Sequence, residues 1–195
     1  MRNHVLKTAL ITLAVTLGVI VISVVGCMLF FPSVVSDITY NMGMYGASAE
    51  YAEKAFVKDG SDASLHTLID RAILAGNDAL VVEYGDEFVD GDYFKSEITA
   101  ENADYYLGSL AVSQYKTGKR EAALETVIFS AVKSFRVHNP TENLMRAVIE
   151  NDDKTFASLL LAEMKDYESV NYTDTERQRY NEMLTLLEGF VSAVE

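Results

Sequence analysis

The sequence predicts an all-α protein, in which one apolar helix spans a membrane and precedes an acidic domain of helical hairpins or an irregular helical bundle. Three observations predict this fold. Residues 8–36 contain no charged side chain. Beyond them, apolar residues recur every three or four positions, as they do on one face of a helix. Finally, only Pro140 follows Pro32, and alternating runs of β-branched residues, which would indicate strands, are missing.

Residues 8–31 are predicted to form the membrane anchor. A helix of about 24 residues is about 36 Å long, enough to cross a hydrocarbon core of about 30 Å. Arg2 and Lys7 precede this segment, so the positive-inside rule predicts a cytoplasmic tail at residues 1–7. We then expect a juxtamembrane linker or helix at 32–60 and an extracytoplasmic helical-repeat domain at 61–195. The predicted location is therefore the cell membrane, with a single pass.

Two other interpretations of the same segment exist. A cleaved signal peptide has a shorter apolar region and a small-residue cleavage site, neither of which is found here. The stretch Val24-Val25-Gly26-Cys27 resembles the lipobox of bacterial lipoproteins, in which the cysteine is lipidated and becomes the new amino terminus. Residues 28–31 are strongly apolar, whereas a lipoprotein normally continues with a polar tether. Lipidation of Cys27 is therefore the alternative to an uncleaved anchor, and both leave the domain tethered outside the cell.

Charge and cysteine content restrict the partners of the domain. All 29 acidic residues lie at or beyond Asp37, whereas two of the 16 basic residues precede the anchor. The domain is thus more acidic than the whole chain, whose formal net charge is −13. Such a domain repels nucleic acid and anionic headgroups. The expected partners are the bilayer, through residues 8–31, and an unidentified protein. The lack of cysteine beyond Cys27 is typical of a bacterial surface protein.

Apolar stripes at helical spacing indicate about seven or eight helices after the anchor. In chain order the stripes lie within residues 65–73, 80–88, 103–111, 124–135, 144–148, 156–160 and 183–194. Turn-forming residues separate them at 58–61, 76–78, 90–92 and Gly118. Asn139-Pro140 reads as an N-cap followed by proline at the first helical position. Thr173 and Glu176 are spaced as a capping box for the last helix.

The turns near Gly76, Gly118 and Asn151 are spaced by about 42 and 33 residues, which is typical of helical-hairpin repeats. Residues 107–131 resemble one tetratricopeptide repeat. The positions that carry the resemblance are Leu107, Leu110, Ala111, Tyr115, Gly118 and Ala123. The flanking hairpins depart from the pattern: Val81 and Phe156 occupy the small position, and the terminal proline is absent near Arg136. The resemblance implies a solenoid whose concave face binds a peptide or a partner domain.

The sequence contains no recognisable catalytic or metal-binding motif. His66 and His138 are the histidines of the domain, and neither belongs to a known pattern. The acidic cluster Asp86, Glu87, Asp90 and Asp92 lacks the order of a calcium loop. The glycines read as isolated turn residues rather than as a phosphate loop. We therefore predict that the protein is not an enzyme and holds neither a cofactor nor a metal.

Tyrosine is the one enriched residue type, with 11 tyrosines and no tryptophan. Tyr105, Tyr106 and Tyr115 open and close the first helix of the repeat-like segment, and tyrosines are common anchors of protein recognition. We predict them as partner-binding residues of a membrane-anchored interaction scaffold. The alternatives are a surface lipoprotein, a membrane-tethered hydrolase with an acidic site between helices, and a structural spacer.

Overall fold

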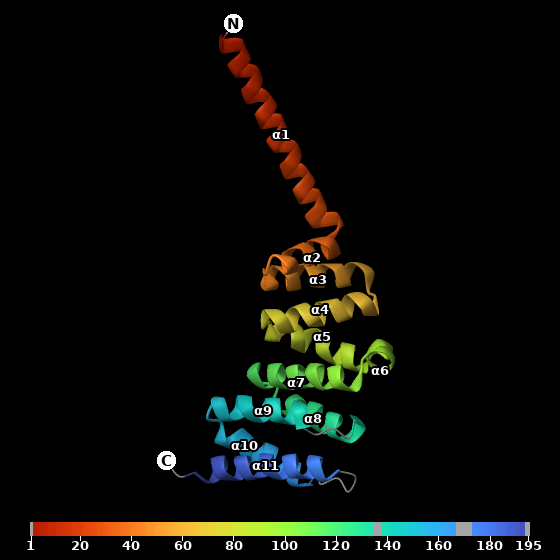
Figure 1. The fold of residues 1–195 in the computed structure, drawn as a ribbon, viewed down its shortest axis with the longest axis vertical. Coiled ribbons are helices and arrows are strands. Elements are labelled where there is room, and N and C mark those ends of the chain that lie inside the picture. The colour runs from red at the N-terminus through yellow and green to blue at the C-terminus, as the bar shows by residue number, and fades with distance from the viewer. Residues whose placement is uncertain (1, 135–137, 167–172, 194–195) are drawn as a thin grey trace. The chain divides into compact units, whose positions relative to one another are not determined.

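The computed structural model describes residues 2–134, 138–166 and 173–193, and within these residues the chain is helical and contains no strand (Figure 1). The prediction of an all-α fold is confirmed. The chain divides into two compact units, Met1–Ala75 and Gly76–Glu195. Helix α4 (Asp62–Ala75) belongs to the first unit, and the division into a juxtamembrane segment at 32–60 and a repeat domain at 61–195 stays a prediction.

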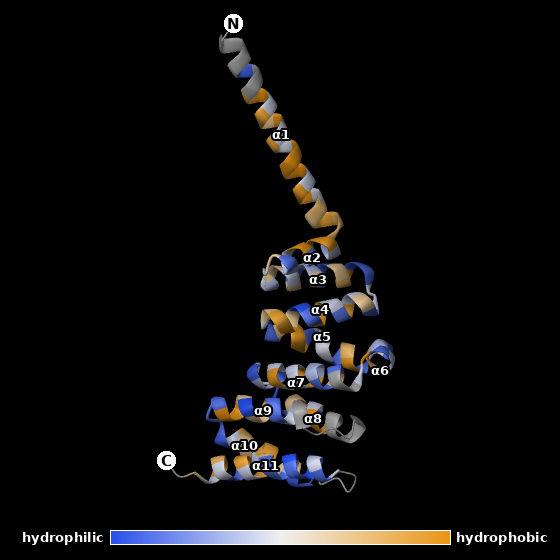
Figure 2. Cartoon of the chain, in the orientation of Figure 1, coloured by the Kyte–Doolittle hydropathy of each residue, from blue (hydrophilic) through white to orange (hydrophobic). Residues whose placement is uncertain are grey.

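The first unit begins with one long apolar helix, and three shorter helices follow it. These are α1 (Arg2–Phe30), α2 (Pro32–Asn41), α3 (Tyr45–Asp59) and α4. Within α1, Leu10–Phe30 is long and apolar enough to cross a membrane, and Figure 2 shows the hydrophobic colouring that runs along it. The helix ends before Pro32, which starts α2 as a proline in the first turn. Residues 32–59 thus form two separate helices and do not continue α1.

Small polar and apolar side chains bring α2 close to α3. The Ser36 hydroxyl donates to the Ser48 carbonyl oxygen, and the Ser48 hydroxyl donates to that of Ser36, each at 2.9 Å. Both serines are buried, and Ala49 and Ala52 continue the small face of α3. This reciprocal bonding satisfies the two buried hydroxyls, which would otherwise destabilise the contact.

Arg71 connects α4 to α2. Its Nη2 donates to Asp37 Oδ1 at 3.3 Å, and its guanidinium lies over the Tyr40 ring, 3.4 Å from the ring centroid. A guanidinium stacks well on an aromatic face while one edge pairs with a carboxylate. The Tyr40 ring is consequently half-covered by protein.

The second unit is a stack of antiparallel helices (Figure 1). Its helices are α5 (Asp78–Asp90), α6 (Asp92–Glu97), α7 (Ala100–Lys116), α8 (Arg120–Ser134), α9 (His138–Glu150), α10 (Lys154–Asp166) and α11 (Asp174–Ser192). The central helix α7 packs against α5, α8 and α9, and α10 packs against α11. Two successive hairpins, α7–α8 and α9–α10, therefore form the body of the unit. Their assignment as tetratricopeptide repeats stays a prediction.

Left-handed residues end the helices at most of the predicted turns, whereas Gly91, in the predicted turn at 90–92, has an extended backbone. Gly60, Gly76 and Gly118 have positive φ, and so does Asp152, beside Asn151. The turn at Gly76 lies at the boundary between the two units, and α4 packs on α3 within the first. The hairpins inside the second unit are those at Gly118 and Asp152. The Thr173–Glu176 capping box is present in full.

Two local predictions from the sequence were wrong. Helix α9 begins at His138, so Asn139 is not its N-cap and Pro140 is the third helical residue. Proline is tolerated there because the first four N–H groups of a helix have no partner within it. The glycines are not all turn residues either. Gly85 and Gly108 lie inside α5 and α7, where an added Cβ would approach Leu110 Cδ1 to 2.6 Å and Asn143 Nδ2 to 2.7 Å.

A buried junction holds the two hairpins together. The Tyr115 ring stacks on Phe156 with 5.0 Å between ring centroids, and its hydroxyl donates to Asp153 Oδ2 at 3.2 Å. Asp153 Oδ1 accepts from the backbone N–H of Phe156 at 3.0 Å, which caps α10. Arg120 donates to the same carboxylate from the start of α8. Burial, and then the neighbouring carboxylate, raise the pKa of Tyr115, so its hydroxyl remains a donor.

Glu142, on α9, connects the hairpins to the last helix, α11. It accepts from Arg146 Nη2 at 2.6 Å and from Arg179 Nη2 of α11 at 3.2 Å. The hydrogen bond from Arg146, with the charges of both arginines, holds the pKa of Glu142 below its ordinary value. The two arginine side chains are exposed, so this pair contributes little to stability and mainly orients α11.

We predict that Asp153→Ala destabilises α10 by about 2 kcal/mol, because one substitution removes a helix N-cap and the acceptor of a buried hydroxyl. Hydrogen exchange of the α9 and α10 amides in the full-length protein measures the loss. Glu150→Ala is the matched control: Glu150 is an exposed acid at the end of α9, and its loss should change stability by less than about 0.5 kcal/mol. Equal effects of the two substitutions would contradict the assignment of Asp153 as the junction.

Candidate functional site

The candidate site is a pocket of about 360 Å³ within the second unit, lined by residues of α5, α7 and α8. Its apolar lining comes from Val89, Leu107, Leu110 and Ala122. Leu107 and Leu110 lie one turn apart on α7, and both are buried. The pocket therefore has an apolar floor that belongs to the packed interior and cannot move independently of it.

Three carboxylates surround this apolar floor. Asp86 and Asp90 come from successive turns of α5, and Glu125 comes from α8. All three are exposed residues, and no lysine or arginine is among the lining residues. The Lys95 amine lies nearby, but it donates to the backbone carbonyl of Asp90. A cationic group entering the pocket would meet acceptors at its rim and apolar atoms below.

A buried amide fixes the wall of the pocket. Gln114 on α7 is only 1% exposed. Its Nε2 donates to Asp86 Oδ1 at 3.1 Å, and its Oε1 accepts from the Thr126 hydroxyl at 2.7 Å. One side chain thereby links the three helices that form the pocket. Because a buried amide without partners would be costly, this network also fixes the orientation of the Asp86 carboxylate.

The positions of Gln114 and Thr126 in the sequence contain a signal that each is a buried polar residue in need of a partner. Both polar residues interrupt apolar stripes: Gln114 follows Leu110 and Ala111 on the packed face of α7, and Thr126 precedes Val127 on α8. A polar side chain at a core position needs a partner. The sequence could not show that one polar residue would be the partner of the other.

The structure places the three predicted tyrosines in different environments. Tyr106 is buried and contacts the rings of Phe88 and Phe94, at centroid distances of 5.0 and 6.4 Å. Tyr115 is buried in the junction with α10. Tyr105 is 44% exposed and lies edge-on to Tyr106. None of the three lines the pocket, and their role in binding a partner stays a prediction.

The other candidate residues from the sequence are His66, His138 and Cys27. His66 Nε2 lies 3.6 Å from Asp70 Oδ2, one turn along α4. His138 starts α9, but its side chain lies outside what the structure describes. Within the described residues, no three histidine, cysteine or acidic side chains converge as metal ligands do. Cys27 lies three residues before the end of α1, in continuous helix, and its lipidation stays a prediction.

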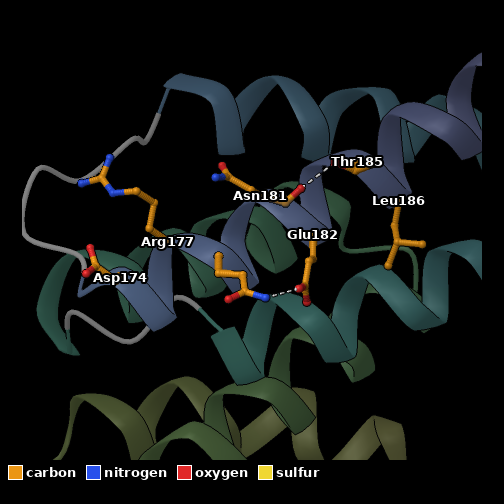
Figure 3. Close-up of a pocket in the computed structure, with 7 residues that line it drawn as sticks. Asp174, Arg177, Asn181, Glu182, Thr185 and Leu186 are labelled. Atoms are coloured by element: carbon orange, nitrogen blue, oxygen red, sulfur yellow. Dashed lines mark hydrogen bonds between the residues drawn. The ribbon is translucent and has the colours of Figure 1, made fainter.

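A second hollow, of about 730 Å³, lies along α11 (Figure 3). All seven residues that line it come from this one helix. Its polar side chains bond within the helix: Gln178 Nε2 donates to Glu182 Oε1 at 3.0 Å, and the Thr185 hydroxyl donates to the carbonyl oxygen of Asn181 at 2.8 Å. This surface is the outer face of the last helix and brings no groups together from different elements.

The sequence matches no protein-family model, and no curated protein is significantly similar to it.

We predict that Thr126→Val destabilises the second unit by about 1–3 kcal/mol, because the isosteric change leaves the buried amide oxygen of Gln114 without its donor. Hydrogen exchange of α7 and α8 in the full-length protein measures the effect. Thr185→Val is the control, since the Thr185 hydroxyl is exposed and bonds within its own helix. If Thr126→Val and Thr185→Val changed stability equally little, the amide oxygen of Gln114 would have another hydrogen-bond donor. The assignment of Gln114 and Thr126 as the fixed wall of the pocket would then be wrong.

Proposed function

We propose that the protein is a single-pass membrane protein whose second unit binds a segment of a partner protein outside the cytoplasm. The anchor is supported by Leu10–Phe30, whose apolar side chains face outward along α1 and are not buried by the rest of the chain. The charge pattern supports the orientation: Arg2 and Lys7 lie on one side of the segment, and every acidic residue lies on the other.

One observation supports the choice of ligand, namely the combination of an apolar floor with a rim of three carboxylates in the pocket of α5, α7 and α8. Lysine and arginine have long apolar stems and cationic ends, which match such a pocket. We therefore propose that it accepts a basic side chain, next to an apolar residue, from an extended or helical segment of the partner. The overall acidity of the domain would speed the approach of such a segment.

Binding fits this pocket better than hydrolysis does. A catalytic acid or base usually has a perturbed environment in a cleft that excludes water. Here Asp86, Asp90 and Glu125 are exposed at the rim. Asp104, a carboxylate buried on α7, does not line the pocket. Residues 28–31 are apolar where a lipoprotein normally continues with a polar tether, and this favours the uncleaved anchor over the lipoprotein.

The orientation predicts the labelling of engineered cysteines. In a Cys27→Ser background, a membrane-impermeant maleimide added to intact cells should label Glu121→Cys, on the exposed surface of α8. It should label Asn3→Cys only after the membrane is permeabilised. Labelling of both positions in intact cells, or of Asn3→Cys alone, would overturn the orientation. Loss of the residue 3 segment from the mature protein with native Cys27 would instead support the lipoprotein.

The ligand class predicts a charge-sensitive cross-link. A photoreactive amino acid at Ala122, inside the pocket, should form an adduct with a partner segment that contains lysine or arginine in native membranes. Glu125→Lys should lower the adduct yield by about tenfold or more, because opposing a cation with a cation costs at least about 1.4 kcal/mol.

Glu121→Lys is the matched control for this cross-link. Glu121 lies one turn before Glu125 on α8, is exposed and does not line the pocket. Equal loss with both substitutions would indicate only a long-range effect of charge. An adduct insensitive to Glu125→Lys, or one formed with an acidic segment, would refute the proposed ligand class. The absence of any adduct at Ala122 would favour the structural spacer.

A further inference from the structure

The first unit exposes an apolar stripe immediately after the anchor. Val34 and Ile38 of α2 are 47% and 50% exposed, and Met42 and Met44, in the turn that follows, are 67% and 50% exposed. With Tyr45, they make up half of the exposed large apolar side chains that the structure describes beyond Phe31. We call these five residues the α2 stripe. The clustering separates them from the scattered apolar residues that any protein surface carries.

The α2 stripe cannot be buried by rotating the helix. Val35 and Ser36 already face α3, and the bonds between Ser36 and Ser48 fix this face. Asp37, which is also exposed, bonds to Arg71 of α4. Helix α2 therefore has one face packed on protein, one polar face, and one apolar face that protein leaves uncovered. An amphipathic helix with such a face is suited to the boundary between headgroups and acyl chains.

The position of the stripe identifies its occupant. Phe30 and Phe31, at the end of the span, are exposed and apolar, and only Pro32 and Ser33 separate them from Val34. Figure 1 shows that the chain turns out of α1 at this point and enters α2 in a new direction. The ammonium group of Lys58, at the end of α3, donates to the carbonyl oxygen of Phe30 at 2.8 Å. The α2–α3 hairpin is therefore held at the end of the apolar helix.

We propose that α2 lies in the interfacial layer of the same membrane that α1 crosses, with the α2 stripe inserted among the outer ends of the acyl chains. This inference rests on the proposed function, because it requires α1 to span the bilayer. The stripe carries no charged residue, so the contact is apolar and does not need anionic lipid. Tyr45 has the amphipathic ring that favours the headgroup level.

Because the chain contains no tryptophan, a single introduced tryptophan reports its own depth without background. The experiment uses the full-length protein in phosphatidylcholine vesicles, with brominated acyl chains as the membrane quencher and acrylamide as the aqueous quencher. Ile38→Trp reports the α2 stripe. Val19→Trp reports the middle of α1, and Leu74→Trp reports an exposed apolar position on α4, outside the stripe. We expect blue-shifted emission and strong quenching by brominated lipid at positions 19 and 38, and aqueous quenching at 74.

A second substitution tests the contact without moving the reporter. Val34→Asp places a charge one turn before Ile38→Trp, on the same exposed face. It should shift the emission of that tryptophan to longer wavelength and expose it to acrylamide, while leaving α1 in the membrane. Ser33→Asp is the control, since Ser33 is exposed outside the stripe, and it should leave the emission of the reporter nearly unchanged.

The outcomes separate this inference from the anchor on which it rests. If Val19→Trp is quenched by lipid but Ile38→Trp is quenched only from water, the anchor stands and the interfacial position of α2 is refuted. If neither is quenched by lipid, the anchor itself fails. Protection of Ile38→Trp from both quenchers, increasing with protein concentration, would show that a second copy of the chain covers the stripe, which also refutes the inference.

Discussion

The second unit depends most on the contact of Tyr115 with Asp153 and Phe156. Tyr115 belongs to α7, whereas Asp153 precedes α10 and caps it. A helical hairpin cannot bury both of its faces alone, so a fixed contact with the next hairpin is necessary for a core to form. The same helix also supplies the pocket. Gln114 is the residue next to Tyr115, and it links α7 to α5 and α8. Adjacent residues of α7 therefore serve the pocket on one face of the helix and the junction on another.

The sequence predicted the features that local chemistry decides. Helical periodicity, the glycines in left-handed conformation at Gly60, Gly76 and Gly118, and the capping box at Thr173 each depend on residues a few positions apart. The pairing of helices was less predictable, because similar apolar stripes can pack in several ways. The packing of α4 on α3 within the first unit, for example, was not predicted. What distinguishes these arrangements is the fit between surfaces, such as the reciprocal serines of α2 and α3.

The candidate site was harder to predict than the fold because its groups are distant in sequence. Gln114, Asp86 and Thr126 become partners only when three helices meet, and no motif records this. The tyrosines show that residue type alone does not distinguish a binding residue from a buried one. Tyrosine is common in recognition sites, but the rings of Tyr106 and Tyr115 are covered by other side chains, namely Phe88, Phe94 and Phe156. A tyrosine ring packs as well in a protein interior as at an interface, provided that its hydroxyl has a hydrogen-bond acceptor. For Tyr115 this acceptor lies 38 residues away.

If α1 crosses a membrane, as we propose, the charge distribution gives the two units different relations to it. An acidic domain is repelled by anionic headgroups, so electrostatics cannot hold it at a bilayer. Contact close to the membrane must then be apolar, which is the character of Val34, Ile38 and Met42 in the first unit. The pocket of the second unit has carboxylates around an apolar floor, and such a rim disfavours lipid but suits a basic segment. Each unit also has its own buried residues, so the proposed ligand site of the pocket and the proposed membrane contact of α2 depend on different sets of packed side chains.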